Sequence, residues 1–207
     1  MVIIGVTGSV GMGKSEISKY FKKNKINVFD SDYQISYLYN NKNILNQIKE
    51  NFPRAFSKNV LSKKSLTEIV FKDKSKLLLL EEILYKKLTK VQAFWIRKNI
   101  REKKKIIVID VPLLFEKDNL NKYDITIVVS CSKETQQRRV LKRKDWNINR
   151  LESTLKNQLD DKIKRELSDI TINTDRGKRY SLEQVIKIIK YARQIIGRPK
   201  NTILKYF

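Results

Sequence analysis

Residues 2–15 read VIIGVTGSVGMGKS and carry the clearest structural signal in the chain. The first five are apolar and rich in β-branched side chains, which predicts a buried strand. The last eight consist of a glycine, four further residues, and glycine-lysine-serine, the pattern of a phosphate-binding P-loop. Apolar residues recur at helical spacing over residues 16–21, so the loop is expected to lie between a strand and a helix.

A loop of this kind binds the phosphates of a nucleotide through its backbone and through the N-terminus of the helix that follows it. Lys14 is expected to reach the β- and γ-phosphates, and the Ser15 hydroxyl is expected to bind Mg²⁺. We therefore predict ATP and Mg²⁺ as cofactors, with ATP contacting Gly11, Met12, Gly13, Lys14, Ser15 and Glu16.

The composition excludes several classes of enzyme. The 207 residues are 41% hydrophobic, enough for a core, but no apolar stretch approaches the roughly 18 residues of a membrane span. Because the first predicted strand begins at residue 2 and Cys131 is the single cysteine, we expect a cytoplasmic protein without a disulfide. The chain has no histidine, which excludes a Ser-His-Asp triad and disfavours zinc.

The net charge of +23 is high enough to raise the question of a nucleic-acid partner. The lysines are nevertheless spread over almost every predicted helix, and the sequence contains no arginine-rich arm and no aromatic RNA-binding motif. We interpret the charge as mostly solvated surface that speeds the association of an anionic substrate. Nothing in the sequence reveals the oligomeric state, and a monomer is favoured.

Strands and helices alternate along the chain, which predicts an α/β fold with a parallel sheet covered on both faces. The expected strands after the first are residues 26–29, 106–110, 125–129 and 170–172. The expected helical spans are residues 33–51, 66–103, 133–144, 148–167 and 182–196, with 52–65 irregular. Within 66–103, one broad apolar face is expected to consist of Leu77, Leu78, Leu80, Ile83, Leu84, Leu88, Val91 and Phe94.

Three aspartates stand at the carboxyl ends of predicted strands, where a parallel sheet places its ligands. Asp30 and Asp32 follow the second strand, and Asp110 ends the third, where it could serve as the acidic residue near the metal. A structural alternative remains open for each, because aspartate is also common at helix N-caps and Asp32 could cap a helix that begins near Tyr33.

The order of these motifs resembles the dephospho-coenzyme A kinase family. The opening VTGSVGMGKS, the segment INVFDSD at residues 26–32 and DVPLLFE at residues 110–116 are similar to motifs of that family, and the last is the most specific of them. Further matches are Glu134, Thr135, Gln136, Arg139, Arg143, Gln158, Lys164, Ser168 and Asp169. Together the matches extend from residue 2 to about residue 173 in the family's order.

The resemblance implies a three-layer P-loop NTPase fold with a five-stranded parallel sheet, an inserted helical substrate domain and a helical lid. The nucleotide-binding core would take residues 1–32, 105–133 and 168–207, the substrate domain 33–104 and the lid 134–167. The implied reaction transfers the γ-phosphate of ATP to the ribose 3′-hydroxyl of dephospho-coenzyme A.

The same resemblance implies roles for individual residues. Asp32 would orient or deprotonate the hydroxyl, with Lys14 and the lid residue Arg143 as further catalytic groups, and Arg139 would contact ATP. Mg²⁺ would be held by Ser15 and Asp110. The substrate would contact Asp32, Tyr85, Asp110, Leu113 and Glu116. Arg139 and Arg143 would lie on one face of the same helix, four residues apart.

One departure from the family pattern stands at Tyr85 and Lys86, where the family usually has His-Pro. Loss of the proline predicts a more continuous helix. Tyr85 can still stack and donate a hydrogen bond, although a partly buried core tyrosine is an equally good interpretation. The remaining alternatives are another small-molecule kinase acting on nucleosides or nucleotides, a nucleic-acid-dependent NTPase, and a protein that binds nucleotide without turnover.

Overall fold

The computed structural model describes residues 1–116 and 120–196, so the apolar and basic residues of the tail at 198–207 lie outside the described part. The chain divides into two compact units. We call residues 1–30 with residues from 99 onward the core unit, and residues 31–98 the inserted unit. The finer division into core, substrate domain and lid stays a prediction.

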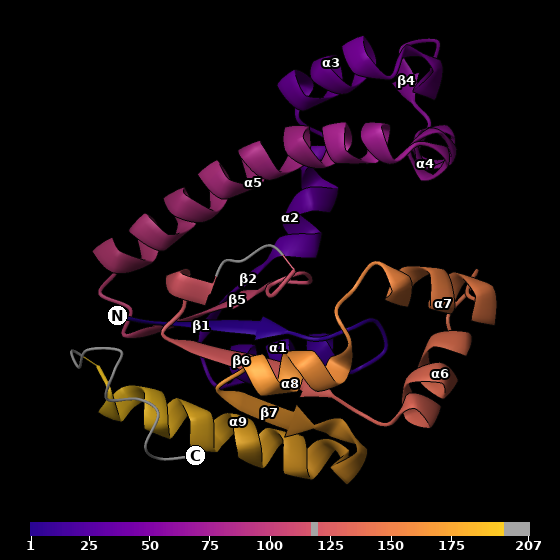
Figure 1. The fold of residues 1–207 in the computed structure, drawn as a ribbon. Helices are drawn as coiled ribbons and strands as arrows, with labels where there is room; N and C mark the ends of the chain where they lie inside the picture. Colours follow the sequence, from indigo (N-terminus) through magenta and orange to yellow (C-terminus); the bar gives the residue numbers. More distant parts are fainter. Residues whose placement is uncertain (117–119, 197–207) are drawn as a thin grey trace. The chain divides into compact units, whose positions relative to one another are not determined.

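The core unit contains the predicted parallel sheet (Figure 1). Its strands are β1 (Val2–Thr7), β2 (Asn27–Asp30), β5 (Ile106–Asp110), β6 (Ile125–Ser130) and β7 (Ile170–Asn173). They run in the order β2-β5-β1-β6-β7, and every neighbouring pair is parallel. The runs of isoleucine and valine that predicted buried strands form this sheet, and β5 and β6 are buried along their whole length.

The two faces of the sheet are covered by different parts of the chain. On one face, alternate side chains of the strands pack in a single cluster with α1 (Lys14–Lys23) and α9 (Gly177–Gln194). On the other face Gly5 leaves room for Leu114 and Tyr123, because a Cβ at residue 5 would lie 2.7 Å from the Leu114 side chain. Leu114, which follows β5, and Tyr123, which follows the short helix η2 (Leu120–Lys122), therefore pack on this second face.

Three short helices connect β6 to β7: α6 (Lys133–Leu141), α7 (Ile148–Lys156) and α8 (Asp161–Leu167) (Figure 1). Each begins at a capping side chain, which is Ser132, Asn147 or Asp160. The predicted helical span 148–167 is wrong as a continuous helix, because α7 ends at Lys156 and Asp160 caps a new helix.

The inserted unit is helical and holds one small hairpin. Its elements are α2 (Ser31–Leu38), α3 (Lys42–Asn51), η1 (Pro53–Ala55), β3 (Phe56–Ser57), β4 (Val60–Leu61), α4 (Lys63–Lys72) and most of α5 (Lys74–Arg101). The predicted helix 33–51 is interrupted, because Asn41 accepts hydrogen bonds from the first turn of α3. The span 66–103 likewise divides at Asp73, whose carboxylate accepts from Ser75 and Lys76 at the start of α5.

Helix α5 runs without a break through Tyr85 and Lys86, as the absence of proline predicts. Its buried apolar side chains are Leu80, Ile83, Leu84 and Leu88, and Asn99 near its C-terminus is buried as well. The predicted apolar face was too broad, because Leu78 is 56% exposed and Phe94 is 63% exposed. An α-helix turns about 100° per residue, so Leu78 points to the side opposite Leu80.

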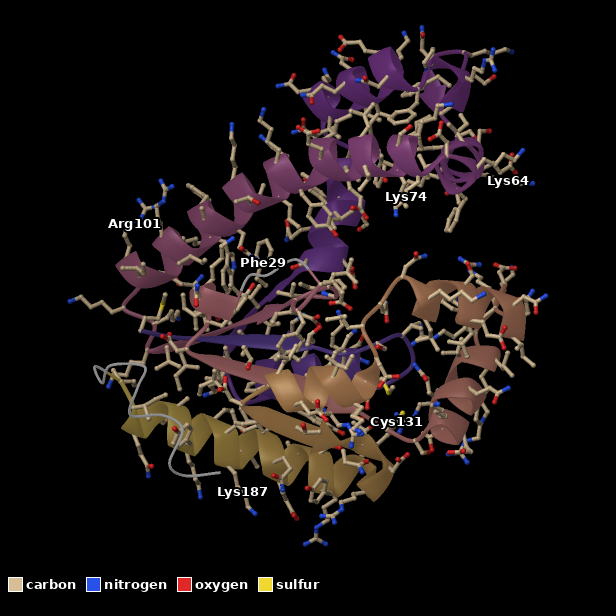
Figure 2. The ribbon with its side chains drawn as sticks, viewed as in Figure 1. Phe29, Lys64, Lys74, Arg101, Cys131 and Lys187 are labelled. Carbon is tan, nitrogen blue, oxygen red and sulfur yellow. The ribbon has the colours of Figure 1, made fainter. Side chains whose placement is uncertain are left out.

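The basic side chains are distributed over the surface rather than gathered in one place. Figure 2 labels Lys64 on α4, Lys74 and Arg101 at the two ends of α5, and Lys187 on α9, and all four are exposed. Among the described helices, none has the length and apolar character needed to cross a bilayer.

Candidate active site

The P-loop leaves the end of β1, the central strand, and leads into α1. Gly13, the N-cap residue of α1, has φ 103° and carries no side chain that could cap the helix. Gly8 lies so close to the neighbouring strand that a Cβ there would be 2.6 Å from the carbonyl oxygen of Val129. Both glycines are therefore required by the backbone, and the uncapped first turn of α1 is a ready anion-binding position.

Beside the loop, Lys14 and Asp110 form an ion pair. The Lys14 Nζ lies 2.6 Å from Asp110 Oδ1, and the Ser18 hydroxyl donates to Asp110 Oδ2 at 2.7 Å. Burial raises the pKa of the Asp110 carboxyl, the Lys14 ammonium and the Ser18 hydroxyl oppose that rise, and the Asp30 carboxylate adds to it. The sheet register aligns Asp110 with Asp30 on β2 and with Val6 on β1. Two of the predicted aspartates therefore lie side by side at the carboxyl ends of β2 and β5.

Asp32 lies in the first turn of α2, in the inserted unit. The helix begins at Ser31, so the alternative that Asp32 is its N-cap is wrong. Tyr85 is half-buried on α5 of the same unit. Burial raises the pKa of Tyr85 to about 12, and the carboxylates of Glu81 and Asp32 contribute to the rise. The phenol and Asp32 are therefore near enough to interact electrostatically, and the phenol stays protonated at neutral pH.

The oxygen atoms at the P-loop suit a hard cation. Asp110 is 4% exposed, whereas the Ser15 hydroxyl, in the first turn of α1, belongs to an exposed residue. Mg²⁺ is commonly held by one or two protein oxygens together with substrate phosphates and water. Within residues 1–116 and 120–196 there is no cluster of three or more acidic, histidine or cysteine side chains that could hold a metal. The residues present thus fit Mg²⁺ bound jointly with phosphate.

Arg139, on α6, fastens the P-loop to the end of β7. Its Nη1 donates to Thr174 Oγ1 at 2.8 Å and to the Met12 carbonyl at 3.3 Å, and Nη2 donates to the Thr174 carbonyl at 3.2 Å. The Thr174 hydroxyl lies 2.8 Å from the same Met12 carbonyl. Gln136 supports the loop as well, because its Nε2 donates to the Val10 carbonyl at 2.7 Å. The contact between Arg139 and ATP stays a prediction.

Arg143 differs from the expectation. Helix α6 ends at Leu141, and Arg143 is an exposed residue in the turn that follows. The predicted arrangement of Arg139 and Arg143 on one helix face is therefore wrong. The run Lys142-Arg143-Lys144 offers no apolar side chain to bury, and Asp145 has φ 63°, which no helix continues through.

A cavity of about 940 Å³ lies between the P-loop and the helices that connect β6 to β7. The loop contributes Ser9 and Met12 to its lining, and α6, α7 and α8 contribute the opposite walls. Cys131, labelled in Figure 2, lies just beyond the end of β6, and its backbone N–H is 3.2 Å from Met12 Sδ. Burial raises the pKa of its thiol, so it is the neutral thiol that lines this cavity.

The DVPLLFE segment begins at Asp110 and ends at Glu116. Glu116 Oε1 lies 2.8 Å from Lys164 Nζ and accepts a hydrogen bond from the Leu159 N–H at 3.1 Å. Leu113 is half-buried. The substrate contacts expected of Leu113 and Glu116 stay predictions. The sequence did not reveal that Lys164 pairs with Glu116 or that Thr174 binds Arg139, because the two residues of each pair are far apart in sequence. Thr174 also belongs to no recognised motif.

A five-stranded parallel sheet with a P-loop after its central strand, and an aspartate at the end of the adjacent strand paired with the P-loop lysine, defines a P-loop nucleotide-binding protein. The dephospho-CoA kinase family model matches residues 2–179. The chain belongs to the dephospho-CoA kinase family, and it is a kinase, a phosphotransferase.

Individual related proteins and solved structures agree with this family assignment. Dephospho-CoA kinase of Bartonella quintana is 36% identical over 190 residues, which cover 92% of this chain and 97% of that one. TT1252 from Thermus thermophilus has a TM-score of 0.81 at 25% identity, covering 91% of this chain and 96% of that one. Dephospho-CoA kinase from Campylobacter jejuni shares the fold, with a TM-score of 0.66 at 21% identity, covering 93% and 97%. None of these favours the nucleoside-kinase or nucleic-acid alternatives.

Proposed function

We propose that this chain transfers the γ-phosphate of ATP to the ribose 3′-hydroxyl of dephospho-coenzyme A, releasing ADP and coenzyme A. The observation that carries the proposal is the Lys14–Asp110 pair at 2.6 Å beside the uncapped N-terminus of α1, in a chain of this family. That arrangement supplies backbone N–H groups, an ammonium and a carboxylate at the topological switch point of the sheet.

The P-loop residues bind and neutralise the triphosphate. The backbone from Gly11 to Gly13 and the N–H groups at Ser15 and Glu16 would surround the phosphate oxygens. Lys14 would exchange its contact with Asp110 for the β- and γ-phosphates, whose combined charge exceeds that of one carboxylate. Phosphoryl transfer depends mainly on this positioning and neutralisation, because its transition state is loose.

Asp32 would accept a hydrogen bond from the attacking 3′-hydroxyl and orient it. A carboxylate suits this role, since no strong base is required for a loose transition state. Tyr85 would act beside Asp32 as a protonated donor, which its raised pKa of about 12 allows at any physiological pH. Asp110, Leu113 and Glu116 are proposed as further contacts of the substrate.

Mg²⁺, when bound, supplies charge neutralisation at the phosphates, and Ser15 and Asp110 would hold it. Arg139 would contact ATP from its position on α6 beside the P-loop. We propose that residues 134–167 form a lid that closes over ATP, brings Arg143 from the exposed turn after α6 to the phosphates, and limits hydrolysis of ATP by water. We further propose a cytoplasmic monomer.

The test is ADP release coupled to a second enzyme, with ATP and Mg²⁺, on dephospho-coenzyme A and on a panel of nucleosides, nucleotides and RNA. Asp32→Asn is expected to lower kcat by at least about a hundredfold while ATP still binds. Glu50→Gln, at an exposed position on α3 of the same unit, is the matched control. Turnover on another substrate but not on dephospho-coenzyme A would refute the proposal.

A further inference from the structure

Lys164 is an ammonium with no access to solvent. Its side chain is 0% exposed on α8, and its Nζ lies 2.8 Å from Glu116 Oε1. A buried charge is costly unless it is paired, and an apolar side chain of the same length would fill the space without that cost. The position therefore carries a charge for a reason other than packing.

The contacts of the pair connect three segments that are far apart in sequence. Glu116 also accepts the Leu159 N–H at 3.1 Å, in the connection between α7 and α8. Lys164 also lies 3.2 Å from the hydroxyl of Ser9, the second residue of the P-loop motif. One ion pair thus joins the end of the DVPLLFE segment, the start of α8 and the phosphate-binding loop.

The same segment holds the P-loop at a second point. Residue 110, its first, pairs with Lys14, and residue 116, its last, pairs with Lys164. The P-loop is consequently tied to residues 110–116 through Lys14 directly and through Ser9 by way of Lys164. Because an ion pair has a preferred distance and direction, two such ties fix the spacing between the loop and the segment.

We propose that Lys164 is a positioning residue for phosphoryl transfer. Its pair with Glu116 holds the P-loop at the spacing from residues 110–116 at which the loop and Lys14 receive the triphosphate. Lys164 touches no reactant and acts through Ser9 and Glu116. The inference rests on the proposed function only where it is tested by kinetics on dephospho-coenzyme A; its test by binding of ATP does not depend on the substrate.

The experiment separates positioning from stabilisation by removing one charge and then both. Lys164→Met or Glu116→Gln alone leaves the partner's charge buried and unpaired, so each single variant is expected to unfold at a lower urea concentration. The double variant removes both charges and is expected to regain most of the stability, because a buried pair is often replaceable by neutral groups.

Activity distinguishes the two roles. For the double variant we expect kcat to fall by about tenfold or more and the KM for ATP to rise, in addition to any rise in the KM for dephospho-coenzyme A from loss of the proposed Glu116 contact. A double variant that recovers both stability and activity would show that the pair serves the fold alone. A rise in the KM for dephospho-coenzyme A with kcat and the KM for ATP unchanged would show that Glu116 acts only as a substrate contact, and would equally overturn the proposal.

Two further variants complete the test. Ser9→Ala keeps both charges and is expected to raise the KM for ATP by about fivefold through loss of one hydrogen bond. An unchanged value would contradict the proposal even if the double variant did not fold. Arg179→Met on α9 breaks an exposed ion pair with Glu183, neither of which lines the cavity beside the P-loop, and is the matched control. Should the wild-type chain not phosphorylate dephospho-coenzyme A, calorimetric binding of ATP by the same variants still tests the inference.

Discussion

The ammonium of Lys14 and the carboxylate of Asp110 lie 2.6 Å apart, with exposed side-chain fractions of only 13% and 5%. The P-loop lysine thus meets a protein carboxylate at the place where the proposed reaction requires it to meet phosphate. The energetic consequences of this pair are open to direct measurement.

Removal of Lys14 is expected to cost more stability than removal of the Asp110 charge. Lys14→Met leaves a buried carboxylate, which should lower the free energy of unfolding by roughly 3 kcal/mol. Asp110→Asn removes the group whose pKa burial raises, and should cost only about 1 kcal/mol. Urea unfolding at pH 7 measures both, with Lys19→Met on the exposed face of α1 as control. Equal losses for the two variants would contradict this account.

Arg139→Lys is expected to raise the KM for ATP by about tenfold. A lysine keeps the charge but cannot span Thr174 and the Met12 carbonyl with one planar group, so only the Thr174 hydroxyl still connects the Met12 carbonyl to the end of β7. Steady-state kinetics with varied ATP measures the effect. Arg138→Lys changes the exposed neighbour on α6 and should leave KM unaltered. If the two variants behave alike, the contacts of Arg139 are dispensable.

Gly8→Ala is expected to destabilise the protein by about 3 kcal/mol or to prevent folding. The added Cβ would lie 2.6 Å from the backbone oxygen of Val129, which cannot move without disturbing β6. Gly177→Ala is the informative comparison, because a Cβ there meets nothing within 4 Å although φ is 90°. Thermal unfolding should show a smaller loss at Gly177, where only backbone strain acts, and the reverse order would refute the steric argument.

Tyr85 should make stability decline at high pH. Burial, with Glu81 and Asp32, raises its pKa to about 12, against roughly 10 for an unfolded tyrosine. The fold therefore favours the protonated phenol. That contribution is complete below about pH 10 and is lost as the pH rises through about 12. Tyr85→Phe should show a smaller loss of stability between about pH 10 and about pH 12 than wild type, measured by urea midpoints.

Exposed Tyr37 provides the control for removal of one phenol, since Tyr37→Phe changes an exposed side chain of the same unit. If the stability of the wild type and of Tyr85→Phe falls in parallel with rising pH, the environment of Tyr85 in the folded state does not cause the loss of stability.

The predictions from the sequence were most accurate where an element or a site residue is determined by its neighbours in the sequence. The strand, P-loop and helix at residues 2–23 are specified by adjacent residues, and Asp110 follows from its place at the end of a buried run. The interruption before α3 was missed although its signal is also local, because Asn41 is a capping residue inside an apparent helical period.

The partners of Arg139 and Lys164 could not be predicted from the sequence. Thr174 is 35 residues from Arg139, and Ser9 is 155 residues from Lys164, so no periodicity links them. Only the assembled sheet, in which β6 pairs with β1 and β7 pairs with β6, brings those residues to its carboxyl edge.

The strand order also has a consequence for how the chain acquires its structure during synthesis. Strands β1 and β2 do not pair with each other, because β5 lies between them and pairs with both. The first 30 residues therefore lack a sheet partner until residues 106–110 have left the ribosome, whereas residues 31–98 form a compact unit of their own. We expect the inserted unit to form early and the sheet to close late, with β1 as the segment most exposed to misfolding in the interval.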